Sequence, residues 1–178
     1  GNYNVGVGRG AMSLLTTGQN NTAMGYNAGG SLTTGQENLL LGVNAGKSTS
    51  PFTVTTQGCR IVLGHNDISN AYIRVAWTVT SDLRDKTNFG TVPHGLDFVN
   101  QLNPVSFQFK ESRENDTPKG GVRYGFKAQD ILALEGDNNV IIDNEQPELL
   151  KMTTSHLVPV LVNAIKELKA RIEVLEDE

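Results

Sequence analysis

The sequence lacks the residues that several classes of protein require. Cys59 is the only cysteine, so no disulfide can form within one chain and no cysteine-rich metal site is available. We expect this single cysteine to be a small buried residue. Lysines and arginines form no cluster, and the net charge is −4, which excludes the dense basic surface that binds nucleic acid.

Long apolar runs are also missing. No stretch approaches the roughly 18 residues of a membrane-spanning helix, and the N-terminus has neither the basic nor the apolar region of a signal peptide. We therefore expect no membrane insertion. Gly1 lies inside a repeat unit, which indicates that the chain is a piece of a longer protein.

Aromatic residues make up only 6% of the chain, whereas most of its 19 glycines lie within the first 64 positions. Large core side chains are therefore scarce where glycine is abundant. This uneven distribution predicts two halves with different structures.

The first half contains an internal repeat of 17 residues. At this offset Asn4, Asn21 and Asn38 superpose, as do the glycines, alanines and apolar residues around them, and residues 61–66 repeat the pattern after an insertion at 47–57. Each unit is a short apolar run followed by Gly-x-Asn-Ala-Gly, which predicts a brief strand and a turn with glycine at positive φ. We expect the insertion to be a loop.

Stacked units of this kind predict a solenoid. Three units bury little apolar surface within one chain, so sharing the core among several chains is favoured, with a monomeric β-solenoid as the alternative. The units resemble the glycine- and asparagine-rich head repeats of trimeric bacterial adhesins and phage tail fibres.

The second half shows signals of both strands and helices. Residues 71–79 are rich in β-branched and aromatic side chains and predict a strand. The remaining pattern predicts a helix at 95–102, a hairpin of strands at 105–110 and 122–126, a helical segment at 128–134, and a short strand at 140–142 after a turn at 137–139.

The C-terminal segment, about residues 153–176, predicts a coiled-coil helix. Its apolar residues alternate steps of three and four and form one seam: Val158, Leu161, Ile165, Leu168, Ile172 and Leu175. Isoleucine at a with leucine at d favours two strands, but the seam is short and neighbouring domains can impose three chains. The alternative is one amphipathic helix packed on its own domain.

Four motifs then occur in order: Ser81-Asp-x-Arg-x-Lys86, Gly95-Leu-Asp with Leu102-Asn-Pro, Tyr124-Gly-Phe-x-Ala-Gln-Asp, and Leu157-Val-Pro-x-Leu-Val-x-Ala-Ile-Lys-Glu-Leu. Together they resemble the endosialidase-type intramolecular chaperone, over about residues 80–178. The resemblance implies an α+β homotrimer, with a β-rich repeat shaft over 1–80 and a mixed α/β chaperone domain over 81–178. It also implies a virion location, in a phage tail fibre, tail spike or neck appendage.

The resemblance further implies that the chaperone folds the upstream fibre domain and is then released by self-cleavage. The scissile bond would join Thr80 to Ser81, with Ser81 as nucleophile and Lys86 as base in a serine-lysine dyad. A lysine acts as a base only when neutral, which requires desolvation or nearby positive charge. For Arg84 the possible roles are to add such charge or to bind a carboxylate, and for Asp82 they are to orient the dyad or to cap a helix.

A different class of function remains open: a permanent trimerisation clamp on an adhesin shaft that binds a host-cell receptor through residues 47–57. We expect no cofactor, because Gly6-Val-Gly-Arg-Gly10 lies inside the repeat and opens no nucleotide-binding βαβ unit. We also expect no metal site, because the three histidines, His65, His94 and His156, lack ligand spacing.

Overall fold

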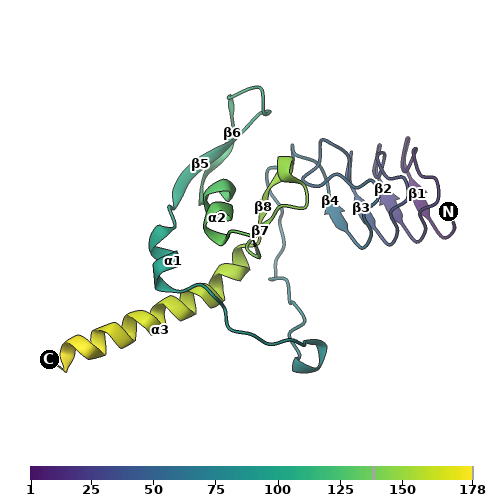
Figure 1. Ribbon diagram of the computed structural model, residues 1–178. Coiled ribbons are helices and arrows are strands. Elements are labelled where there is room, and N and C mark those ends of the chain that lie inside the picture. Colours follow the sequence, from purple (N-terminus) through teal and green to yellow (C-terminus); the bar gives the residue numbers. More distant parts are fainter. Residues whose placement is uncertain (138, 178) are drawn as a thin grey trace. The chain divides into compact units, whose positions relative to one another are not determined.

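The computed structural model describes residues 1–137 and 139–177, and its contacts divide the chain into two units, 1–72 and 73–178. The first unit is a stack of four coils. Its strands, β1 (Val5–Val7), β2 (Thr22–Met24), β3 (Leu39–Leu41) and β4 (Ile61–Leu63), form one parallel sheet in that order (Figure 1).

The strand register reproduces the repeat. Val5 pairs with Thr22, and Thr22 with Leu39, at the 17-residue offset, whereas Leu39 pairs with Ile61 because the insertion lengthens one coil. The central residues of β2, β3 and β4 are buried inside the coils, and the flanking residues face outward. One repeat therefore builds one coil.

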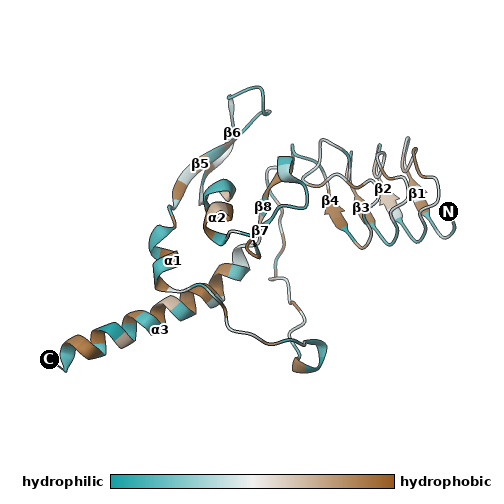
Figure 2. Ribbon diagram, in the orientation of Figure 1, coloured by the Kyte–Doolittle hydropathy of each residue, from teal (hydrophilic) through white to brown (hydrophobic). Residues whose placement is uncertain are grey.

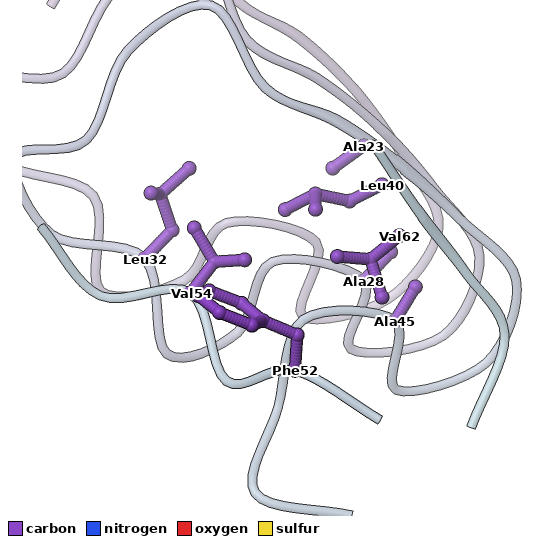
Figure 3. Close-up of a cluster of buried hydrophobic side chains, with 8 residues drawn as sticks. All are labelled: Ala23, Ala28, Leu32, Leu40, Ala45, Phe52, Val54 and Val62. Carbon is purple, nitrogen blue, oxygen red and sulfur yellow. The ribbon is translucent and has the colours of Figure 1, made fainter. Parts of the chain in front are cut away.

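Figure 3 shows the small core of this unit. Its buried side chains come from the strands, the turns and the insertion: Ala23, Ala28, Leu32, Leu40, Ala45, Phe52, Val54 and Val62. The insertion is a loop, as expected, but it also belongs to the core through Phe52 and Val54. Buried Ser50 closes it by donating to the Phe52 carbonyl at 2.6 Å.

Glycines let adjacent coils approach closely. Each strand is followed by a glycine at positive φ, and a Cβ added to Gly8 would lie 2.6 Å from the carbonyl oxygen of Gly25 one coil away. Because no real Cβ tolerates that distance, this position requires glycine for its backbone angle and for its space. The predicted turn chemistry is confirmed here.

The superposed asparagines form a buried ladder along the stack. Asn21 donates its amide to Asn4 Oδ1 at 3.0 Å and to the Gly35 carbonyl at 2.9 Å, and its own Oδ1 accepts from the backbone and side-chain N–H groups of Asn38. Arg60 occupies the place of Asn38 in the next coil, and its backbone N–H ends the ladder by donating to Asn38 Oδ1. The ladder therefore satisfies turn groups that would otherwise be buried without partners.

The prediction that Cys59 is buried is wrong. Cys59 is exposed at φ 57°, in the same place as Glu37 one coil earlier, and its Sγ lies 3.3 Å from the Glu37 carboxylate. That hydrogen bond, and the negative charge of Glu37, raise the pKa of the Cys59 thiol. The repeat turns this position outward, whatever side chain occupies it.

The second unit mixes short helices and strands. Its elements are the 3₁₀ turn η1 (Leu83–Asp85), α1 (Leu96–Gln101), the antiparallel hairpin β5 (Val105–Lys110) and β6 (Pro118–Gly125), α2 (Ala128–Glu135), the antiparallel pair β7 (Ile142–Asp143) and β8 (Lys151–Met152), the 3₁₀ turns η2 (Pro147–Leu149) and η3 (Thr154–His156), and α3 (Leu157–Glu176). Its core consists of Phe98, Ile131, Ile141, Ile142, Leu157 and Val160.

Most predicted elements of this unit lie within a few residues of their expected places. The strand expected at 140–142 is observed at Ile142–Asp143, and Asn138 of the expected turn lies outside the described residues. The backbone N–H groups of Val140, Ile141 and Ile142 all donate to the buried Glu135 carboxylate, at 2.7 to 3.0 Å. This carboxylate anchors the chain after α2.

Candidate functional site

The strand predicted over 71–79 does not form in the single chain. Residues 66–93 are exposed throughout, and 71–79 contain no helix or strand. The large apolar residues Ile73, Val75, Trp77 and Val79 occupy alternate positions, and each is more than half exposed. A strand needs a hydrogen-bonding neighbour, and the part of the chain that the structure describes supplies none here, so β propensity alone gives an extended segment.

Ser81 and Lys86 are brought together directly after this segment. The 3₁₀ turn η1 reverses the chain between them, and the Lys86 backbone N–H donates to the Leu83 carbonyl at 3.2 Å. As a result Lys86 Nζ lies 2.7 Å from Ser81 Oγ. Both residues are exposed in the single chain. A nucleophile and a base at hydrogen-bonding distance are what nucleophilic catalysis requires.

Asp82 begins the same turn as its N-cap. Its Oδ1 accepts from the Arg84 backbone N–H at 2.9 Å and from Arg84 Nε at 3.0 Å, and its Oδ2 accepts from Arg84 Nη2 at 2.6 Å. The Arg84 side-chain hydrogen bonds, followed by that of the backbone, lower the pKa of Asp82, and the same contact raises the pKa of Arg84. Of the roles considered, the structure shows that Asp82 caps the turn and that Arg84 binds a carboxylate, which is that of Asp82.

The helix α3 uses two different faces. Leu157, Val160 and Ala164 are buried against the second unit. We call the other apolar face the α3 seam: Val158, Leu161, Ile165, Leu168, Ile172 and Leu175. All six seam residues are exposed, by 42% to 70%, and Figure 2 shows hydrophobic bands continuing along α3 to its C-terminal end.

A polar row on α3 holds the chain that leads from the junction into α1. Asn163 Nδ2 donates to the carbonyls of Val92 and His94, at 3.2 and 3.3 Å, and Glu167 accepts from the Leu96 backbone N–H at 2.7 Å. Gly95 leaves the room that this carboxylate occupies, because an added Cβ would clash with it. The seam helix therefore also fixes the start of α1.

Residues 81–140 match the model of a peptidase family described as the chaperone of endosialidase. The matched segment begins at Ser81 and includes Lys86, α1, the β5–β6 hairpin and α2. The second unit contains an endosialidase-type chaperone domain. No curated protein and no solved structure matches the chain.

The resemblance found in the sequence is thus confirmed for the chaperone domain, to which the family assigns an intramolecular chaperone role and a peptidase name. The match ends before α3 and does not include the repeats. Sequence reasoning singled out Ser81 and Lys86, which lie in contact in the structure, but missed the polar row on α3 and the Glu135 anchor. In the sequence, Asn163, Glu167 and Glu135 appear only as polar residues within or next to predicted helices, and such residues are common on solvent-exposed faces.

Two further findings concern other kinds of site. Within residues 1–137 and 139–177, no three His, Cys, Asp or Glu side chains gather as metal ligands, and no helix is long and apolar enough to cross a membrane. The histidines make separate contacts: His65 with Asp67 at 3.2 Å, His94 stacked on Phe98, and His156 with the Val140 carbonyl at 2.8 Å.

Proposed function

We propose that the chain is the C-terminal part of a homotrimeric viral fibre or appendage, whose chaperone domain drives trimer assembly and is then released by cleavage between Thr80 and Ser81. The observation that carries the cleavage proposal is the 2.7 Å contact between Lys86 Nζ and Ser81 Oγ. It occurs at the first residues of the matched chaperone segment.

Three exposed apolar surfaces support assembly with further copies of the same chain. The first is the outward face of the β1–β4 sheet, including Val5, Met24 and Ile61. The second is the alternating row from Ile73 to Val79, and the third is the α3 seam. Large exposed apolar surfaces are rare on monomeric proteins and indicate an interface. A heptad seam specifically fits an identical helix.

The proposed reaction is an acyl shift followed by hydrolysis. Neutral Lys86 takes the proton of Ser81 Oγ, and the oxygen attacks the Thr80 carbonyl carbon. The C–N bond breaks, the Ser81 amine receives a proton, and Thr80 is left as an ester on Ser81 Oγ. Water then hydrolyses the ester, which gives a Thr80 carboxylate and regenerates the Ser81 hydroxyl at a new N-terminus.

Assembly is the step that would activate the dyad. An exposed lysine is protonated near neutral pH, and burial favours its neutral form. The row from Ile73 to Val79 ends one residue before Thr80, so pairing of this row with other copies would order the scissile bond and reduce the exposure of Lys86. Because α3 holds residues 92–96, docking of the seam would bring the same segment into place.

Denaturing electrophoresis after refolding tests the cleavage. Wild type is expected to give two bands, with residues 1–80 and 81–178, and sequencing of the larger fragment should begin at Ser81. Ser81→Ala and Lys86→Ala are expected to give one full-length band, whereas Lys166→Ala, an exposed lysine on α3, should cleave as wild type does. One identical full-length band for all four proteins would contradict self-cleavage and favour the permanent trimerisation clamp.

A further inference from the structure

We propose that Arg84 is a positioning residue for the proposed cleavage: it holds the Asp82 carboxylate in a bidentate pair and so keeps that carboxylate from pairing with the Lys86 ammonium. This inference rests on the proposed function of Ser81 and Lys86. It assigns the role of the charged pair that lies between them in the sequence.

The geometry of the turn makes the competition direct. Asp82 is next to the nucleophile, and η1 brings Lys86 back to that point, with Nζ 2.7 Å from Ser81 Oγ. A free carboxylate at position 82 would lie within one turn of the same ammonium group. It would favour the charged amine, which cannot act as a base, and would draw it away from the serine hydroxyl.

Arg84 prevents this by occupying both carboxylate oxygens. Its Nε donates to Oδ1 at 3.0 Å and its Nη2 to Oδ2 at 2.6 Å, which is the two-pronged geometry that arginine makes with a carboxylate. Lysine at this position would supply one point of contact only. The pair is neutral overall, so Asp82 adds no uncompensated negative charge beside the dyad.

The other charges around the turn do not take over this role. Asp85 adjoins Lys86 in the sequence and is exposed. Asp85 is unchanged in every variant below, so its effect on Lys86 is the same in all of them. Residues 66–93 are exposed in the single chain, where Lys86 Nζ contacts Ser81 Oγ.

The test compares Arg84→Ala, Asp82→Asn and the double variant Asp82→Asn/Arg84→Ala in the full chain. Asparagine keeps the N-cap oxygen but removes the charge. A charge within about 4–6 Å shifts the pKa of an amine by one unit or more. We therefore expect Arg84→Ala to cleave about tenfold more slowly at neutral pH, with its pH–rate profile moved about one unit higher. The double variant should return to the wild-type profile.

A second readout does not depend on cleavage. Acetic anhydride acetylates only neutral amines, so the extent of Lys86 acetylation against pH, followed by mass spectrometry in the Ser81→Ala background, reports the state of the base. Arg84→Ala should require higher pH for acetylation, and the double variant should not. Lys166, on α3, serves as the internal control.

The outcomes separate the two proposals. If wild type is not cleaved but acetylation shifts as expected, the proposed function fails, whereas the effect of the Arg84–Asp82 pair on the Lys86 amine is confirmed. An Arg84→Ala profile equal to that of wild type overturns the role of Arg84, and so does a loss of cleavage that Asp82→Asn does not restore, since Arg84 would then act directly on the reacting groups.

Discussion

Replacement of Asn21 by alanine would remove the central rung of the asparagine ladder. The side chain is completely buried and makes four hydrogen bonds, two as donor to Asn4 and Gly35 and two as acceptor from Asn38. Each is worth about 1 kcal/mol net, and partners left buried without water cost more, so we expect a loss of about 4 kcal/mol. Gln19→Ala, an exposed neighbour, should cost almost nothing.

Hydrogen exchange of the strand amides provides the assay. Thr22 N–H donates to the Asn38 carbonyl and Leu39 N–H to the Arg60 carbonyl, both at 2.8 Å, so both amides report opening of the coils. A loss of about 4 kcal/mol lowers their protection by roughly a thousandfold. If these amides are equally protected in the Asn21→Ala and Gln19→Ala proteins, the ladder is not what stabilises the coils and the reasoning is refuted.

Two further substitutions test local features of the fold. Gly25→Ala places a Cβ 2.7 Å from the Gly42 carbonyl at φ +131° and should destabilise the first unit by about 2 kcal/mol, measured by urea unfolding; Gly90→Ala, with nothing within 4 Å, should have no effect. Glu135→Gln replaces a carboxylate that accepts three backbone N–H groups and should cost the second unit about 3 kcal/mol by the same measurement, whereas Glu176→Gln on the exposed end of α3 should not. If a variant and its control unfold at the same urea concentration, the corresponding contact does not stabilise its unit.

The repeat could be predicted because a solenoid repeats its contacts as well as its sequence. The 17-residue offset of Asn4, Asn21 and Asn38 is the register of the sheet, and the glycines mark the turns. The offset does not predict whether the insertion contributes to the core. Phe52 and Val54 are apolar residues in a segment without periodicity, and only the three-dimensional packing shows that they are buried.

The candidate site was predictable in part. The serine and lysine stand out because they begin the motif that resembles the chaperone family, and a spacing of five residues is compatible with one tight turn. Their actual contact depends on Asp82 starting a 3₁₀ turn, which several other conformations of the same residues would not produce. The state of residues 71–79 was not predictable, since strand propensity does not tell whether a pairing neighbour lies in the same chain.

Contacts over long sequence separations were the hardest to foresee. Glu167 meets the backbone of Leu96 across 71 residues, and no local pattern distinguishes it from the other acidic residues of α3. The seam, in contrast, was recognisable from its spacing alone. The structure adds that it differs from the face formed by Leu157, Val160 and Ala164, which packs on the second unit.

Light scattering on the Ser81→Ala protein, which stays in one piece, tests the central claim of assembly most directly. The account predicts a mass three times that of the 19.2 kDa chain, and a shift to single chains when Ile165→Asp places a charge on the seam. A folded species of 19.2 kDa at every accessible concentration would contradict it.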